Sequence, residues 1–169
     1  MVDRFLATNL TDIYAIGDCA QQRIPIENRP SVEAVWYTGR MMGETVAQTI
    51  MGYPKEYTPG QWFNSAKFFD IEYQTYGWIH AQKQKNEEHL YWSEGNKAMR
   101  IAFDKNSQKI LGLHALGIRM RHEHIDQWLN KGESLDYVIK HLQEALFDPE
   151  LYRSPVGQIQ QTFNTQIVV

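Results

Sequence analysis

A carboxylate at the end of a short apolar run is the first feature of this chain that could do chemistry. The run is Ile13-Tyr14-Ala15-Ile16, and Gly17 and Asp18 follow it directly. Its apolar, partly β-branched residues predict a buried strand. Ligands of open α/β sheets bind outside the carboxyl ends of the strands, where a glycine permits close approach to the backbone. An ionised Asp18 accepts hydrogen bonds, so Gly17 and Asp18 are candidates to bind ribose or ribityl hydroxyls.

A helix is predicted to follow this strand and to pack closely against a neighbour. Ser31 is its candidate N-cap, and Val35, Gly39, Gly43 and Ala47 recur at steps of four. Each glycine costs a helix roughly 1 kcal/mol relative to alanine, so a packing reason for both is expected. The stripe alone favours a helix that lies tightly on a sheet and binds no ligand.

The beginning of the chain carries a family resemblance. Thr8 and the segment Asp12-Ile13-Tyr14-Ala15-Ile16-Gly17-Asp18, with Val2-Asp3 upstream, resemble the second flavin motif of the FAD-dependent pyridine nucleotide-disulfide oxidoreductases. Ferredoxin and rubredoxin reductases belong to this class. The resemblance implies that Asp18 binds the ribityl chain of FAD and that the following helix points its N-terminus at the flavin. It also implies NAD(P)H as the co-substrate of the parent enzyme.

The cofactor sites are nevertheless expected to be incomplete. No GxGxxG motif occurs in the chain, so the turn that cradles the phosphates of FAD or NAD(P)H is not supplied by these residues. We therefore expect a C-terminal fragment of a reductase, inactive alone, without the N-terminal FAD and NAD(P) domains. No catalytic residue is assigned to it.

Composition excludes several other classes of protein. The net charge of −3 gives no indication of a nucleic-acid partner, and no apolar run approaches the roughly 18 residues that span a bilayer. A single cysteine excludes an internal disulfide framework and favours a reducing, cytoplasmic location. Cys19 has no second cysteine with which to form a redox pair, and we expect it to be a small buried residue.

Lysine usage indicates a domain junction. The first 54 residues contain no lysine, and turn residues punctuate the change near Lys55. We expect residues 1–54 to be the end of an FAD-binding domain and residues 55–169 to be a C-terminal dimerisation or interface domain.

The second part is predicted to be a half-buried antiparallel sheet followed by helices. Apolar and polar residues alternate over 71–76 and 99–103, the run 104–109 resembles a hairpin loop, and 110–117 is apolar enough to be central. Residues 90–92 add a short strand. The fold class is therefore α+β: an antiparallel sheet with C-terminal helices, preceded by the last strand and helix of a truncated α/β domain.

Two helices are expected to close this domain. Ile125, Trp128 and Leu129 form the apolar face of the first, which ends at Gly132. Ser134 caps the second, whose apolar face comprises Leu135, Val138, Ile139, Leu142 and Leu146, and Phe147-Asp148-Pro149 ends it. The block resembles the C-terminal domain of the same reductases, most clearly in WFNSAKFFDIEYQTYG. The resemblance implies a homodimer and an electron-acceptor protein as a partner.

Two clusters, one polar and one aromatic, can each be interpreted as structural or as functional. The first, Arg119, Arg121, His122, Glu123, His124 and Asp126, is more simply a solvated helix start than a metal or catalytic site, and no metal ligands are assigned. It does not replace the His-Pro dipeptide of glutathione-reductase-like proteins, which the chain lacks. The second, Trp62, Phe63, Phe68 and Phe69, is expected to pack in the core rather than to cover a flavin.

Two functions from different classes remain open. In the first, the chain is part of an enzyme that passes electrons from NAD(P)H through FAD to an unidentified acceptor. In the second, it is a free-standing α+β dimerisation or protein-interaction module without a cofactor. The first also predicts self-association, because Ile13, Ile16, Val35, Trp36, Val46 and Ile50 would lack their usual cover.

Overall fold

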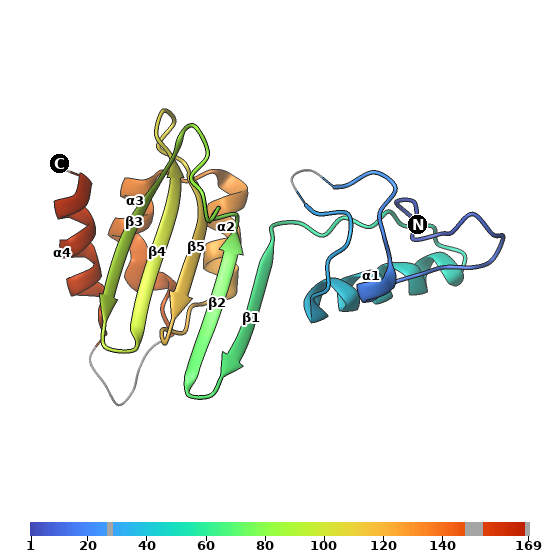
Figure 1. Ribbon diagram of the computed structural model, residues 1–169, viewed down its shortest axis with the longest axis horizontal. Helices are drawn as coiled ribbons and strands as arrows, with labels where there is room; N and C mark the ends of the chain where they lie inside the picture. Colours follow the sequence, from blue (N-terminus) through green and yellow to red (C-terminus); the bar gives the residue numbers. More distant parts are fainter. Residues whose placement is uncertain (27–28, 148–153, 168–169) are drawn as a thin grey trace. The chain divides into compact units, whose positions relative to one another are not determined.

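The computed structural model of the chain describes residues 1–26, 29–147 and 154–167. The chain divides into two compact units, Met1–Gly60 and Gln61–Val169 (Figure 1). Among the described residues, no helix is long and apolar enough to cross a membrane.

The unit 1–60 is built around one long helix, α1 (Trp36–Ile50), and one short 3₁₀ turn, η1 (Gly17–Cys19). Its small core combines residues of α1 with residues of the extended segments: Val2, Leu6, Ala20, Ile26, Met42, Val46 and Tyr57. Because so few side chains are buried, much of the apolar surface of this unit stays exposed.

The segment predicted as a strand differs from the expectation. Within residues 13–16, only Tyr14 forms a bridge, with Ala7, and the bonds Thr8 N–H to Ile13 O and Ala15 N–H to Leu6 O flank it. A strand needs a continuous partner, and the turn of residues 8–13 gives this segment only a single point of pairing. Its apolar residues are consequently exposed rather than buried, Ile13 to 49% and Ile16 to 38%.

The unit 61–169 contains one antiparallel sheet of five strands in the order β1-β2-β5-β4-β3. The strands are β1 (Phe63–Phe68), β2 (Ile71–Gly77), β3 (Glu87–Glu94), β4 (Lys97–Asp104) and β5 (Ile110–Leu116). The apolar run 110–117 is central, as predicted, and it pairs with β2 and β4. Asp104 closes the predicted loop between β4 and β5, where its Oδ1 accepts N–H bonds from Asn106 and Ser107.

Helices cover one face of this sheet (Figure 1). They are α2 (His122–Lys131), α3 (Leu135–His141), the 3₁₀ turn η2 (Leu142–Ala145) and α4 (Val156–Ile167). Leu113 and Ala115 of β5 share the core with Ile125 of α2, Val138 of α3 and Ile159 of α4. The α+β class predicted from the sequence is confirmed.

The ends of α2 and α3 follow their predicted signals. Gly132 adopts the left-handed conformation that ends α2, and the Ser134 hydroxyl accepts the Tyr137 N–H at 3.2 Å. The second predicted helix is shorter than expected, because the chain tightens into η2 after His141. Leu142 and Leu146 are still buried, whereas Asp148 and Pro149 lie outside the described residues.

Two elements were not predicted from the sequence. Helix α4 has an apolar face of Val156, Ile159 and Phe163 that packs in the core, so a third helix closes the unit rather than two. Strand β1 was missed because it joins β2 through Phe69-Asp70, which carries none of the usual Asn-Gly or Asp-Gly turn signals.

The close packing at the centre of the sheet predicts that the stability of the chain depends strongly on Gly112. A Cβ at Gly112 would lie 2.8 Å from the carbonyl oxygens of both Trp78 and Tyr76, so Gly112→Ala should destabilise the chain by about 3 kcal/mol. The matched control is Gly157→Ala in α4, where a Cβ meets nothing within 4 Å and should stabilise the helix by about 0.5 kcal/mol. Urea unfolding followed by circular dichroism measures both, and equal effects would contradict this packing.

Candidate functional site

Gly17 and Asp18 lie together in the turn η1 of the unit 1–60. Gly17 has a φ of +72°, a left-handed conformation that side chains other than glycine rarely adopt. Its N–H faces the Met42 sulfur of α1 at 3.3 Å, and its carbonyl accepts the Ala20 N–H at 2.9 Å. Asp18 is exposed and accepts no hydrogen bond from the described residues. Its carboxylate is therefore free to accept bonds from a ligand.

The two glycines of α1 lie beside this turn. A Cβ at Gly39 would lie 3.4 Å from the Gly17 Cα, and one at Gly43 would lie 3.7 Å from the Ile16 Cδ1. Both distances are ordinary van der Waals contacts that an alanine could also make, so the expected packing reason for the two glycines stays a prediction. Their neighbour is an irregular turn rather than a strand of a sheet.

The N-terminus of α1 is uncapped by any side chain. Val35 occupies the N-cap position with extended dihedral angles, and no acidic residue lies in the first turn. The prediction that Ser31 is the cap is wrong, because residues 31–35 are not helical and the Ser31 carbonyl accepts the Gln22 N–H instead. The first turn of α1 therefore keeps backbone N–H groups and a partial positive charge that suit an acceptor or anionic group.

A buried ion pair holds the segment that leads into this helix end. Arg29 Nη1 donates to Glu33 Oε2 at 2.7 Å, and both side chains are almost fully buried. The Thr38 hydroxyl in the first turn of α1 donates to the same carboxylate oxygen at 3.0 Å, and Arg29 Nη2 reaches the Gly60 carbonyl. Glu33 thus ties the preceding segment to the first turn, and the sequence patterns did not indicate this role.

The side chain of Tyr57 is buried in the same unit. Its hydroxyl is buried without a hydrogen-bond partner among the described residues. Burial, followed by the nearby negative charge of Glu33, raises the pKa of Tyr57 to about 12. Tyr57 is therefore neutral across the physiological range.

Two expectations for side-chain burial in this unit are wrong. Cys19 is exposed rather than buried, because η1 turns it away from the small core. Val46 is buried on α1, whereas it was expected to lack cover. Trp36 and Ile50 lack cover, as expected for an isolated unit, and Val35 is half-buried. Ile13 and Ile16 also lack cover, although their segment was predicted to be a buried strand.

The polar cluster at residues 119–126 does not converge on one point. Arg119 pairs with Glu72 at 2.7 Å, and Asp126 accepts from Asn130 at 2.9 Å. His122 packs against the rings of Phe63 and Tyr76, so this helix start is partly packed rather than simply solvated. Within the described ranges, no three His, Cys, Asp or Glu side chains gather as metal ligands.

The four aromatic residues at the start of the second unit are also dispersed. Trp62 stacks on Trp78 with ring centroids 5.3 Å apart, and Phe63 packs against the core. Phe68 and Phe69 lie at the other end of β1 and are exposed, Phe69 to 95%. The expectation of core packing is therefore wrong for these two, because the turn between β1 and β2 projects beyond the helices.

A buried carboxylate, missed by the sequence analysis, holds two histidines in the unit 61–169. Glu87 lies at the start of β3. Its carboxylate oxygens lie 2.7 Å from His80 Nδ1 and 2.6 Å from His89 Nε2, both within hydrogen-bond distance. The backbone N–H groups of His80 and Gln84 donate to it as well. Burial acts to raise the pKa of Glu87, but the bonds from His89, His80 and Gln84 outweigh it and lower the pKa to about 2. Residues 80 and 87 are distant from any motif, so no spacing signal pointed to them.

The buried ion pair before α1 yields a prediction with a matched control. Glu33→Ala removes the carboxylate that faces a buried guanidinium and should cost about 3–5 kcal/mol. Glu44→Ala removes the partner of Arg40 in an exposed pair of the same i,i+4 spacing and should cost less than about 1 kcal/mol. Hydrogen exchange of the α1 amides measures both. Equal loss of protection in the two variants would contradict a special role for Glu33.

The Glu87 carboxylate predicts how stability depends on pH. Because its pKa is lowered from 4.5 to about 2 on folding, the carboxylate stabilises the chain above pH 4.5, and this contribution disappears as the pH falls toward 2. The shift corresponds to at most about 3 kcal/mol. Thermal unfolding between pH 7 and 3 should show a flatter profile for Glu87→Gln, which is also less stable at pH 7. Glu94→Gln, at the exposed end of the same strand, should keep the wild-type profile.

Comparison with known proteins adds a fold relationship to this geometry. The solved structure of an NAD-dependent persulfide reductase from A. fulgidus matches 98% of this chain with a TM-score of 0.68 and 16% identity, over 33% of its own length. A FAD-dependent pyridine nucleotide-disulphide oxidoreductase from Desulfovibrio vulgaris matches 98% of the chain with a TM-score of 0.64 and 14% identity, over 42% of its length. No family model matches the chain.

A curated relative supports the same relationship from sequence. The ferredoxin reductase subunit of 5,5'-dehydrodivanillate O-demethylase from Sphingobium sp. is 36% identical over 86 residues, which are 50% of this chain and 20% of that protein. The chain thus spans about a fifth of this curated relative, and 33% and 42% of the two solved structures. The resemblance carried by its first residues is confirmed: this chain has the fold of a part of the FAD-dependent pyridine nucleotide-disulphide oxidoreductases.

Proposed function

We propose that this chain is the C-terminal part of an FAD-dependent oxidoreductase that passes electrons from NAD(P)H through FAD to an acceptor. The observation that carries the proposal is the turn at Gly17 and Asp18, held against α1 by the close approach to Gly39. That turn presents an unpaired carboxylate beside a helix whose N-terminus has neither a cap nor an acidic residue. The solved relatives of the same fold are oxidoreductases.

The residues present fit part of an FAD site. Asp18 would accept hydrogen bonds from ribityl hydroxyls, and Gly17 would let the cofactor approach the backbone. The N–H groups at the start of α1 would face an electron-rich edge of the flavin. When bound, FAD supplies the redox chemistry by accepting a hydride and releasing electrons. The chain's own residues bind and orient it, and no catalytic residue is assigned to them.

Several finer features belong to the same proposal. Residues 1–54 would be the end of the FAD-binding domain and residues 55–169 a dimerisation or interface domain of a homodimer. The FAD-binding and NAD(P)-binding parts that would complete the enzyme would lie outside this chain, which covers 33% and 42% of the two solved structures. An electron-acceptor protein would be the partner, and a cytoplasmic location fits a chain with a single, unpaired cysteine.

The alternative function is a free-standing dimerisation or interaction module without a cofactor. Exposed apolar side chains of the first unit, among them Trp36, Ile50 and Met51, favour it, because surfaces of this kind serve in association. The two functions differ in one measurable respect: only the first gives Asp18 a ligand.

The decisive experiment measures retention of FAD by the full-length protein. Asp18→Asn removes the negative charge from an acceptor whose charge-assisted bonds are each worth roughly 1.5–3 kcal/mol, so FAD should dissociate at least tenfold more readily. Glu56→Gln is the matched control, since it removes the charge of another exposed carboxylate of the unit 1–60, outside the motif, and should leave FAD bound. The isolated chain of 169 residues should itself purify without flavin absorbance. Unchanged retention in Asp18→Asn would show that the flavin motif is wrongly assigned.

A further inference from the structure

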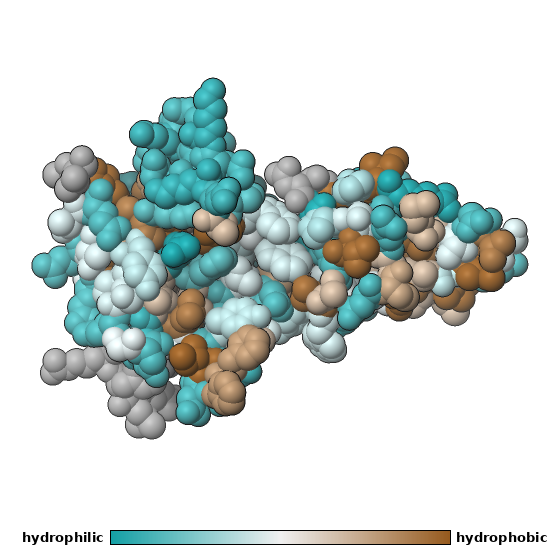
Figure 2. All heavy atoms as spheres, viewed as in Figure 1, coloured by the Kyte–Doolittle hydropathy of each residue, from teal (hydrophilic) through white to brown (hydrophobic). Residues whose placement is uncertain are grey.

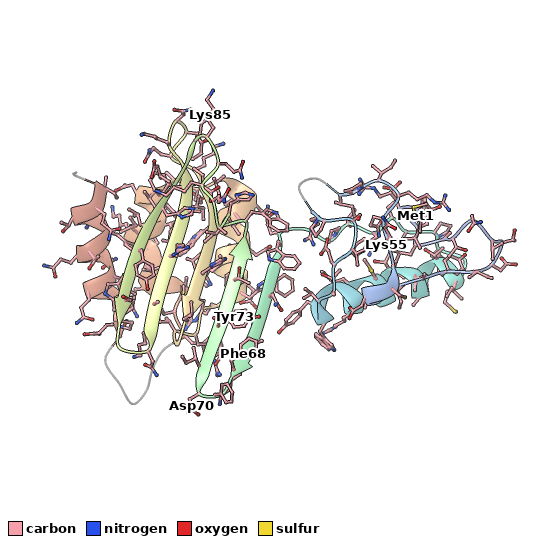
Figure 3. All side chains as sticks on the ribbon, viewed as in Figure 1. Met1, Lys55, Phe68, Asp70, Tyr73 and Lys85 are labelled. Atoms are coloured by element: carbon pink, nitrogen blue, oxygen red, sulfur yellow. The ribbon has the colours of Figure 1, made fainter. Side chains whose placement is uncertain are left out.

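The face of the sheet opposite the helices is hollowed near the turn between β1 and β2. The cavity measures about 430 Å³, within the range of roughly 300–1,000 Å³ typical of small-molecule sites. It lies entirely within the unit 61–169. Figure 2 shows apolar side chains gathered at this end of the sheet, and Figure 3 labels Phe68, Asp70 and Tyr73 there.

The walls of the cavity are aromatic and aliphatic. Phe68 and Tyr73 stack with ring centroids 5.7 Å apart and planes 11° apart, which leaves their faces parallel. Phe69, Ile71 and Leu116 complete the apolar lining. The two rings contact each other, so they form one aromatic wall of the cavity, on which a planar ring can pack.

One edge of the cavity is polar. Thr75 and His114 are register partners, so their side chains share this face, and both line the cavity. Arg100 is the partner of His114 on the other side, in β4. None of the described residues that line the cavity is acidic. Two charged residues adjoin it: Arg100, whose guanidinium also lies 5.5 Å from the centroid of the Tyr91 ring, and Asp70 in the turn between β1 and β2.

The surroundings of His114 favour its neutral form. Burial, the positive charge of Arg100 and the proximity of His89 all lower the pKa of His114. A neutral imidazole keeps one N–H to donate, and the permanent positive charge of the edge comes from Arg100.

Backbone strain marks the same place. Phe69 has a φ of +51°, a left-handed conformation that costs a non-glycine residue roughly 1–2 kcal/mol, and its ring is almost fully exposed. Burial in the core does not offset that cost, as it would for an inward-facing ring. A large ring held in a strained, solvent-exposed position beside a cavity has a use if it contacts a ligand.

We propose that this cavity binds a small planar aromatic carboxylate, with the ring between Phe68, Phe69 and Leu116 and the carboxylate directed toward His114 and Arg100. The ring supplies apolar contact, and the positively charged edge selects the anion over a neutral or cationic analogue. The site is separate from Gly17 and Asp18 and does not depend on the proposed FAD function.

Calorimetric titration of the whole chain with 1-naphthoate tests the proposal. Saturable binding at least fivefold tighter than that of 1-naphthalenemethanol is expected, and 1-naphthylmethylamine should bind more weakly than either. Leu116→Trp, a change at a partly exposed position that fills the cavity, should abolish binding of all three compounds. Absence of saturable naphthoate binding, or binding that survives Leu116→Trp, would overturn the proposal.

Two further variants separate the charge from the ring. Arg100→Met should weaken naphthoate at least fivefold and leave the alcohol within twofold, whereas the control Lys105→Met, in the turn after β4, should change neither. Phe69→Gly should raise the melting temperature by relieving strain and weaken the acid and the alcohol equally. Retained melting temperatures establish that the other variants fold. Equal losses in Arg100→Met and Lys105→Met would show that the edge does not recognise the carboxylate.

Discussion

The alternation of side chains along β5 is the constraint on which the unit 61–169 depends. A strand at the centre of a sheet points successive side chains to opposite faces, and here only one face carries helices. Leu113 and Ala115 therefore enter the core, while His114 and Leu116 are left on the other face. The same alternation that builds the core creates the row of Thr75, His114 and Arg100. A shift of register by one residue would exchange the two sets.

In the unit 1–60, buried polar interactions fix the positions of segments that a larger hydrophobic core would otherwise hold. Few side chains are buried there, yet the Arg29 and Glu33 pair lies among them. Removing two charges from water is costly, and the geometry compensates by giving Glu33 both a guanidinium and the Thr38 hydroxyl. The result is a defined position for the first turn of α1 relative to the segment before it. The candidate site consists of one turn and one helix end, and neither belongs to a regular sheet. Other interactions must therefore fix the position of the helix end.

Residues with strong local signals were predicted correctly from the sequence. The β4 to β5 hairpin, the central β5, the cap at Ser134 and the end at Gly132 all follow from turn chemistry or periodicity. Strand β1 lacked such a signal, because Phe69 occupies a turn position where glycine or asparagine is usual. The strand expected at residues 13–16 shows the opposite failure: its composition suits a strand, but pairing depends on a neighbour that composition does not reveal.

The candidate site was predictable only where residues adjacent in sequence form it. Gly17 and Asp18 were found because they follow one another in a motif, and the two glycines of α1 because they recur on one helix face. Glu87, Arg29 and Glu33 were not found, since a carboxylate becomes structural only through the groups that fold around it. Cys19 was placed wrongly for the same reason: the usual burial of cysteine is an average, and the turn η1 decides the individual case.

The contact between α4 and β3 has a consequence for how this protein avoids aggregation. The Gln166 side chain accepts the Tyr91 N–H and donates to the Tyr91 carbonyl, at 3.0 and 2.7 Å, so its amide imitates one residue of a neighbouring strand. Sheet edges with open backbone groups recruit strands from other molecules. At Tyr91 that place is taken by a helix of the same chain, and any foreign strand that pairs there must first displace α4. The last helix therefore closes the core and also guards the edge beside it.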